Sequence, residues 1–333
     1  FCPIQVRYLE ASQVVHLFQT PQNYIAGLVC FGKSLFLNGQ ETDHIPVVNI
    51  PLGPFKKESY IEVWSGEHPF IYVQEESIQV ACNQHYLFGS VQGWESSALS
   101  LEDLTCATYQ LILDQISELG YPHLFRVWNY FPEINLTNHG LERYQQFCIG
   151  RHRAFSSQTK KFQTVLPAAT AVGTHSGSLQ INFLAGKQPG NHIENPRQMS
   201  AYEYPEFYGP KSPSFSRATM AIAENHHHLF LAGTASIIGH ATQHPGNPAK
   251  QTQETLRNID AVVRHAQEIY PVSCSLAERQ SLAKVYIRNR EHFCDIEEIV
   301  TDHLGDSLEV LYLQGDICRN DLLVEIEAIF HFP

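Results

Sequence analysis

Two glutamates near the end of the chain have the spacing that acid–base chemistry requires. In the run LLVEIEAIF, residues 322–330, one face of the expected strand is apolar, and the other places Glu325 and Glu327 between Leu323 and Ile329. If this face points into a cleft, desolvation raises a carboxyl pKa and makes the group a proton donor near neutral pH. If it faces solvent, the carboxylates are ordinary surface charges, and the pattern alone slightly favours that interpretation.

A second concentration of polar and aromatic side chains lies in residues 191–218. This stretch contains four prolines, follows neither a helical nor a strand period, and is too rich in tyrosine and phenylalanine for a disordered segment. We expect an ordered loop that offers rings, hydroxyls and the cations Arg197, Lys211 and Arg217 to a planar anionic ligand. A purely structural surface loop is the alternative.

Arginines are concentrated in the middle of the chain. None occurs between Tyr8 and Phe125, and six follow between Arg126 and Arg217. Because a guanidinium pairs bidentately with a carboxylate, this group could hold a small carboxylate ligand. Surface ion pairs would explain the same arginines equally well. The net charge of −12 argues against a nucleic-acid partner.

The histidines and cysteines predict neither a metal site nor a redox site. His226–His228 are consecutive, so they would alternate between the faces of a strand, and no cysteine or carboxylate completes a set with His240 and His244. The eight cysteines include no CxxC pair, which is typical of buried thiols in a reducing cytoplasm. No membrane span or signal peptide is evident. We therefore expect a cytoplasmic protein without a membrane partner.

The elements that must position these residues form two similar series. In the first half we expect strands at 14–18, 24–32, 60–64 and 77–82, a helix at 101–119, a strand from 124 that ends at Pro132, and a helix from 141 to Gly150. In the second half we expect strands at 178–185 and 229–238, a helix at about 250–269, and strands at 284–288, 307–313 and 322–330. The pattern predicts two α+β domains, 1–160 and 161–333, the second carrying most of the candidate catalytic residues.

Long, correctly ordered blocks of the sequence resemble the chorismatase family, formerly labelled pteridine-dependent dioxygenase-like. They include RVWNYFPEIN (126–135), ERYQQFCIGRHRAF (142–155), ENPRQMSAYEYPEFYGPKSPSFSRA (194–218) and LQGDICRNDLLVEIEA (313–328). The resemblance implies two YjgF/RidA-like (chorismate-mutase-like) domains, with mixed sheets and helices packed on one face. It also implies removal of the enolpyruvyl group of chorismate as pyruvate, with neither a metal nor an organic cofactor.

The resemblance further implies roles for individual residues. Glu325 would be the general acid that protonates the enol-ether methylene, and its neighbour Glu327 receives no role. Five side chains would bind the substrate: Tyr144, Arg151, Arg153, Tyr208 and Arg217. Cys318 has no adjacent histidine to activate it as a nucleophile. It occupies a position where subtypes differ, and a cysteine there is associated with 3-hydroxybenzoate as product, in some members together with 4-hydroxybenzoate.

Other interpretations stay open on the sequence. A hydrolysing subtype would release pyruvate and a dihydroxycyclohexadiene carboxylate. A non-catalytic or deaminating YjgF/RidA-like trimer would bind metabolites, but it explains neither Glu325 nor the length of the chain. A pterin-dependent oxygenase would need an iron site of two histidines and a carboxylate, for which no convincing set is found. Because two domains can bury internally the surfaces that a trimer buries between subunits, we expect a monomer.

Overall fold

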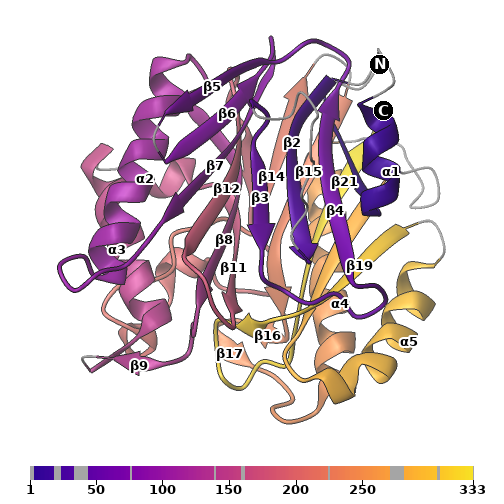
Figure 1. Cartoon of the computed structure of the whole chain (residues 1–333). Coiled ribbons are helices and arrows are strands. Elements are labelled where there is room, and N and C mark those ends of the chain that lie inside the picture. Colours follow the sequence, from indigo (N-terminus) through magenta and orange to yellow (C-terminus); the bar gives the residue numbers. More distant parts are fainter. Residues whose placement is uncertain are drawn as a thin grey trace.

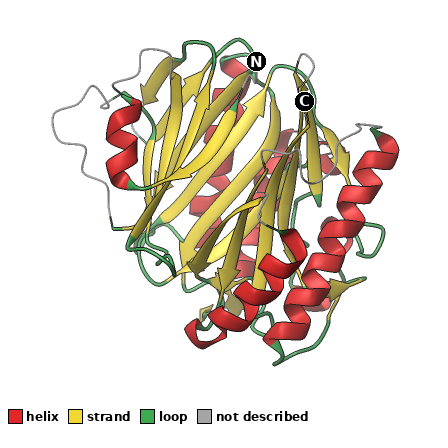
Figure 2. Cartoon of the chain, turned by 90° about the vertical axis from the view of Figure 1, so that its right-hand side faces the viewer, coloured by secondary structure: helices red, strands yellow, loops and turns green. Residues whose placement is uncertain are grey.

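A computed structural model of the chain describes residues 4–18, 24–33, 44–75, 77–138, 140–158, 162–223, 226–270, 281–305 and 308–332. Three β-sheets meet around a shared core, and the helices lie on their outer faces (Figures 1 and 2). The mixed α+β fold with helices packed on one face of each sheet is the one expected from the sequence. No helix in the described ranges has both the length and the apolar character needed to cross a membrane.

The first large sheet has seven strands in the order β20-β11-β8-β12-β7-β6-β5. Their bounds are Asp316–Ile317, Ala168–Thr174, His123–Pro132, Leu179–Gly186, Tyr86–Gly93, Ile78–Cys82 and Ile71–Glu75. Helices α2 (Leu101–Glu118) and α3 (Arg143–Gln158) cover one face, where Tyr109 and Phe147 pack against Val127 and Phe131. Ser100 begins α2 by accepting a hydrogen bond from the Asp103 amide at 3.2 Å.

The second large sheet has six strands in the order β13-β14-β15-β21-β18-β19. Their bounds are Asn191–Ile193, Ala218–Ala223, His226–Ala235, Val324–Phe332, Ser281–Ile287 and Leu308–Gln314. Helices α4 (Pro248–Ile269) and α5 (Phe293–Leu304) cover its outer face. Asn247 begins α4 by accepting a hydrogen bond from the Lys250 amide at 2.9 Å. Pro248 occupies the first turn, where the backbone N–H that proline lacks would have no partner within the helix.

A third, four-stranded sheet comes from the N-terminal residues, in the order β1-β4-β2-β3. Its strands are Gln5–Leu9, Ser59–Gly66, Tyr24–Gly32 and Val47–Ile50, and α1 (Ala11–Leu17) packs on it. The predicted strand at 14–18 is therefore wrong. Glu10 and Gln13 cap each other's backbone at the helix start, and Val14 is buried against Ile25, so local capping outweighs the strand propensity of two valines.

Large aromatic side chains from all three sheets form the shared core. Trp64 of β4 stacks on Phe88 of β7 with ring centroids 5.4 Å apart and meets Trp128 of β8 edge-on at 5.3 Å. Phe230 of β15 and Tyr286 of β18 belong to the same cluster. The three sheets consequently pack as one body, in which residues far apart in the sequence face one another.

Short elements complete the connections between the sheets. Two hairpins pair β9 (Thr137–Asn138) with β10 (Leu141–Glu142) and β16 (Ile237–Ile238) with β17 (Ala241–Thr242). Single 3₁₀ turns lie at Phe162–Val165, Ala201–Glu203, Glu206–Tyr208 and Arg290–His292. Strands β11 and β12 follow residue 160 and yet pair with β8, so the seven-stranded sheet takes strands from both sides of that position. The domain division at residue 160 stays a prediction.

Candidate active site

A cavity of about 240 Å³ lies between the two large sheets. Helix α3, the loop before β14, strand β15 and the segment from β20 to β21 supply its walls. The ionisable, thiol and aromatic side chains that line it are Glu142, Tyr144, Cys148, Tyr204, Tyr208, Lys211, Phe215, Arg217, Cys318, Arg319, Asp321 and Glu325. A smaller cavity of about 30 Å³ shares Tyr144, Cys318 and Glu325 with it and adds Arg151. The site therefore gathers six of the seven side chains that the sequence resemblance implied.

Strand alternation on β21 aims Glu325 into this site. Val324 and Ile326 pack in the cluster beneath α4, so the opposite face of the strand turns toward the seven-stranded sheet. Glu325 is 4% exposed. Across from it, the register of β15 and β21 shifts between Leu231 and Thr234, and Gly233 lies in this irregularity. A Cβ on Gly233 would lie 2.0 Å from Oε1 of Glu325, so the absence of a side chain there gives the carboxyl its space.

The environment of Glu325 favours its protonated form. Burial, and next the negative charge of Glu327, raise the pKa of Glu325 to about 8, while Arg126, Arg217 and Arg288 lower it by less. Among the described residues no hydrogen-bond donor contacts the Glu325 carboxyl. At neutral pH the group is consequently mostly protonated and can donate a proton to a ligand in the cavity.

Helical spacing places three residues of α3 on the side of the cavity. Tyr144, Cys148 and Arg151 are separated by four and three positions, which puts them on one face of the helix. Arg151 is buried and lies over the rings of Tyr109 and Phe155 at 5.0 Å and 5.6 Å. Its Nε and Nη2 atoms have no hydrogen-bond partner among the residues that the structure describes. A buried guanidinium with free donors is suited to bind a carboxylate.

Arg217, at the end of the loop before β14, is the second arginine of this kind. One of its terminal nitrogens donates to the Met199 carbonyl and to the Tyr204 hydroxyl, both at 2.8 Å, and its buried Nε has no partner. Within the part of the chain that the structure describes, Arg217 forms no ion pair. Loop and cation together match the expectation that residues 191–218 are ordered and present rings and positive charge.

The other four central arginines are engaged elsewhere. Arg126 pairs with Glu327, Arg143 with Glu95, and Arg197 with Glu254. Arg153 is half-exposed on the outer side of α3 and pairs with Glu102 at 2.9 Å and Asp103 at 2.8 Å. Arg153 lines neither cavity, so the substrate-binding role that the resemblance implied for it is not supported by its position, and we leave it out of the proposed site.

Tyr208 and Arg319 form the rim on the side of the aromatic loop. The Tyr208 hydroxyl donates to the His240 carbonyl at 2.7 Å. The Arg319 guanidinium lies 4.0 Å from the centre of the Tyr208 ring and 5.0 Å from that of Tyr204, and donates to the same carbonyl at 2.8 Å. The sequence reasoning missed Arg319, although it follows Cys318 directly. It also missed Gly233 as part of the site, whereas Lys211, one of the cations expected from the loop, does line the cavity.

Cys318 faces the cavity but is not activated as a nucleophile. Burial, and next the charge of Glu325, raise its pKa well above the ordinary thiol value. Burial likewise raises the pKa of Cys148 to about 12. Both thiols are neutral at physiological pH. Cys318 can therefore shape the cavity next to the candidate acid, whereas attack by a thiolate is not favoured.

A larger cavity lies elsewhere, between β3 and strands β6, β7 and β12. Its volume is about 600 Å³, and its described lining consists of serine, glutamine, asparagine, glycine, proline, valine, isoleucine and Trp94. It therefore offers no charged or acidic side chain among the residues described. The cavity between the two large sheets is therefore the candidate active site, because among the described residues it combines a protonated carboxyl with guanidinium groups.

Known proteins resemble this chain over most of its length. Residues 62–185 match the family described as chorismatase FkbO/Hyg5-like, N-terminal. A 3-hydroxybenzoate synthase of Streptomyces hygroscopicus is 34% identical over 86% of both chains. A chorismatase of Streptomyces rapamycinicus is 37% identical over 82% of both. A chorismatase crystal structure at 1.08 Å resolution superimposes with a TM-score of 0.85, at 32% identity, covering 99% of this chain and 98% of that one. This chain belongs to the chorismatase family.

Proposed function

We propose that this protein converts chorismate into pyruvate and 3-hydroxybenzoate, with Glu325 as the general acid. The observation that carries the proposal is a buried carboxyl with a pKa of about 8 that faces a cavity lined by guanidinium groups. The names of the relatives, chorismatase and 3-hydroxybenzoate synthase, support the substrate and the product. Neither a metal nor an organic cofactor takes part in the proposed reaction.

The charge of the site suits a dicarboxylate. Chorismate carries one carboxylate on its ring and one on its enolpyruvyl side chain. Arg217 and Arg151 have free donors on the two cavities that meet at Glu325, so each can pair with a carboxylate. Tyr144 and Tyr208 add flat surfaces for the ring. Holding both ends of the substrate fixes the reacting carbon beside the acid, which lowers the entropic cost of the reaction.

The proposed reaction begins with proton transfer from Glu325 to the methylene carbon of the enol ether. The double bond of the side chain supplies the electron pair, and an oxocarbenium ion forms next to the ether oxygen. The oxygen of the ring C4 hydroxyl then attacks C3 and its proton passes to the Glu325 carboxylate, which restores the acid. The bond between C3 and the ether oxygen breaks, the side chain leaves as pyruvate, and an epoxide forms across C3 and C4. Opening of this epoxide with loss of a ring proton gives 3-hydroxybenzoate. The two products together contain the atoms of chorismate, so no water or oxidant is consumed.

Cys318 belongs to this proposal as a neutral wall of the cavity. Its thiol lies on both cavities with Glu325 and is held in the protonated form by burial. A neutral side chain beside the oxocarbenium ion leaves the ring hydroxyl as the nearest nucleophile. Attack by water at that position would instead give a dihydroxycyclohexadiene carboxylate. Formation of some 4-hydroxybenzoate would indicate that the epoxide opens in two ways.

Replacement of Glu325 by glutamine tests the assignment of the acid. The Glu325→Gln substitution keeps the size of the side chain and removes its transferable proton. We expect kcat for pyruvate release to fall by about 10²–10⁴-fold, with KM changed only a few-fold because Arg151 and Arg217 are intact. Glu309→Gln, on β19 of the same sheet and outside the cavity, is the matched control. Turnover of Glu325→Gln within about threefold of the wild type would remove Glu325 from the mechanism.

A further inference from the structure

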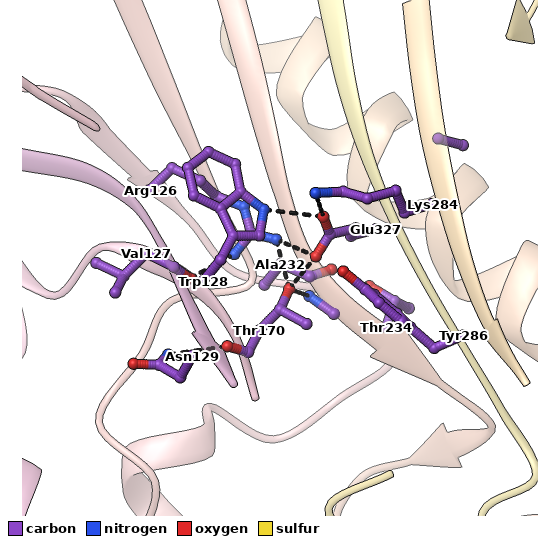
Figure 3. A network of polar contacts seen from close by, with 12 residues as sticks. Arg126, Val127, Trp128, Asn129, Thr170, Ala232, Thr234, Lys284, Tyr286 and Glu327 are labelled. Carbon is purple, nitrogen blue, oxygen red and sulfur yellow. Dashed lines mark hydrogen bonds and ion pairs between the residues drawn. The ribbon is translucent and has the colours of Figure 1, made fainter. Parts of the chain in front are cut away.

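Glu327 lies on the same face of β21 as Glu325, and its surroundings are very different. Its Oε2 atom accepts hydrogen bonds from Arg126 at 2.7 Å and from Thr170 at 2.5 Å (Figure 3). Its Oε1 atom accepts one from the Trp128 indole at 2.8 Å and pairs with Lys284 at 2.8 Å. The carboxylate is therefore held by four donors from strands β8, β11 and β18.

These contacts keep Glu327 ionised although it is only 3% exposed. Burial alone would raise its pKa, but the charges of Lys284 and Arg126 and the hydrogen bonds from Lys284 and Thr170 outweigh burial, so the pKa lies below its ordinary value. Lys284 also pairs with Glu62 at 2.8 Å, and the carboxylates hold its pKa well above the ordinary value despite burial. Glu62, Lys284, Glu327 and Arg126 thus form a buried row of alternating charge.

The row ends next to the candidate acid. Successive residues of a strand rise by about 3.3 Å, so two side chains on the same face start about 7 Å apart. Arg126, which is bonded directly to Glu327, is the cation that lowers the pKa of Glu325 most, but the opposite effect of Glu327 is larger. Arg217 and Arg288 also lower the pKa of Glu325, and Arg151 lines the smaller cavity beside it. Arg288 is paired with Asp316 at 2.8 Å, and Arg217 would be paired with a bound carboxylate.

The other ionisable groups around Glu325 do not replace the effect of Glu327. Tyr144 and Cys318 face it from α3 and from the segment after β20, and burial raises the pKa of both, so they are neutral. Buried ion pairs contribute little net stability compared with well-packed apolar residues. A buried charge row that ends beside the acid is therefore better explained by an effect on the acid than by an effect on the stability of the fold.

We propose that Glu327 is a positioning residue of the site: its fixed negative charge keeps the neighbouring Glu325 carboxyl in the proton-donating form. The inference rests on the proposed function of Glu325 as the acid. Glu327 already has the largest charge effect on Glu325, and a substrate carboxylate that neutralises Arg217 removes one of the cations that oppose it. The acid is consequently held protonated while the substrate is bound and the enol ether is in place.

The dependence of kcat on pH for the Glu327→Gln variant tests this proposal. A unit charge about 7 Å away, at an effective dielectric constant of about 20, shifts a pKa by about one to two units. We expect the alkaline limb of the profile to shift to lower pH by about one to two units, so kcat at pH 8 falls more than kcat at pH 6. Glu62→Gln removes a carboxylate from the far end of the same row and is expected to leave the limb in place.

The proposal would be overturned if the alkaline limb of folded Glu327→Gln stayed within about 0.3 pH units of the wild-type limb. It would also be overturned if the limb of Glu62→Gln shifted by the same amount as that of Glu327→Gln. Should Glu327→Gln fail to fold, NMR titration of the wild-type protein with ¹³C-labelled glutamate side chains tests the premise of the proposal, an ionised Glu327 beside a protonated Glu325. The Glu325 signal, assigned by its loss in Glu325→Gln, is expected to titrate near pH 8 while one carboxylate stays ionised down to low pH. Titration of Glu325 near its ordinary value would contradict the proposal, whether or not chorismate is a substrate.

Discussion

The substitution Gly233→Ala displaces the carboxyl of the candidate acid without replacing any ionisable residue. A Cβ at this position would lie 2.0 Å from Oε1 and 2.8 Å from Cδ of Glu325. Ordinary contact begins at 3.4 Å, so the carboxyl oxygen must withdraw by about 1.4 Å. Misplacement of a reacting group by about 1 Å lowers the rate about 10²-fold, which corresponds to about 2.7 kcal/mol of activation free energy.

We therefore expect kcat of Gly233→Ala to fall about 100-fold while KM changes little, because the arginines keep their positions. The assay is pyruvate release from chorismate, followed by coupling to lactate dehydrogenase, with thermal unfolding measured on the same samples. Gly53→Ala is the matched control, since a Cβ there meets nothing within 4 Å. If Gly233→Ala unfolds at the wild-type temperature and retains kcat within about threefold, the position we assign to the acid is wrong.

Two further predictions concern ligand binding and stability. Arg217→Ala is expected to raise KM about 10- to 100-fold through loss of a charge-assisted pair worth about 1.5–3 kcal/mol, whereas Arg153→Ala, which removes a surface cation, is expected to leave KM unchanged; equal effects in steady-state kinetics would contradict this assignment. Burial, then the charge of His331, lowers the pKa of His228 to about 3, below its unfolded value of about 6.5, so the unfolded chain binds more protons and stability falls as pH drops from about 6.5 toward 3. His228→Phe is expected to flatten this dependence in urea unfolding at pH 7, 6 and 5, and an unchanged slope would show that His228 does not cause it.

Regular periodicity made the large elements predictable. The alternation in residues 322–330 placed both glutamates on one face of β21, and the apolar stripe of α4 fixed that helix. The N-terminal part was harder to predict. Val14 looks like a strand residue, but the reciprocal cap of Glu10 and Gln13 makes the segment helical. Helix α5 was missed although Phe293, Ile296, Val300 and Leu304 recur at helical spacing, so the signal for this helix was present in the sequence.

Sequence motifs predicted most of the residues of the site, but they did not predict which side chains face the cavity. Arg151 and Arg153 lie in one motif, yet two positions along a helix correspond to a turn of about 200°, so one faces the cavity and the other faces solvent. Gly233 matters because β15 is irregular opposite Glu325. A glycine inside a strand pattern is a sequence signal for such an irregularity, but it does not identify the side chain that occupies the space. The partners of Glu327 come from three strands that pack together only in the folded protein.

The central claim is that this site releases pyruvate from chorismate through Glu325. Its most direct test is incubation of the purified protein with chorismate, with pyruvate quantified and the ring products separated by chromatography, beside Glu325→Gln under the same conditions. We predict pyruvate and 3-hydroxybenzoate in equal amounts from the wild type, and little of either from the variant. Absence of pyruvate above the uncatalysed background would contradict the claim, and a dihydroxycyclohexadiene carboxylate as the ring product would contradict the proposed course of the reaction.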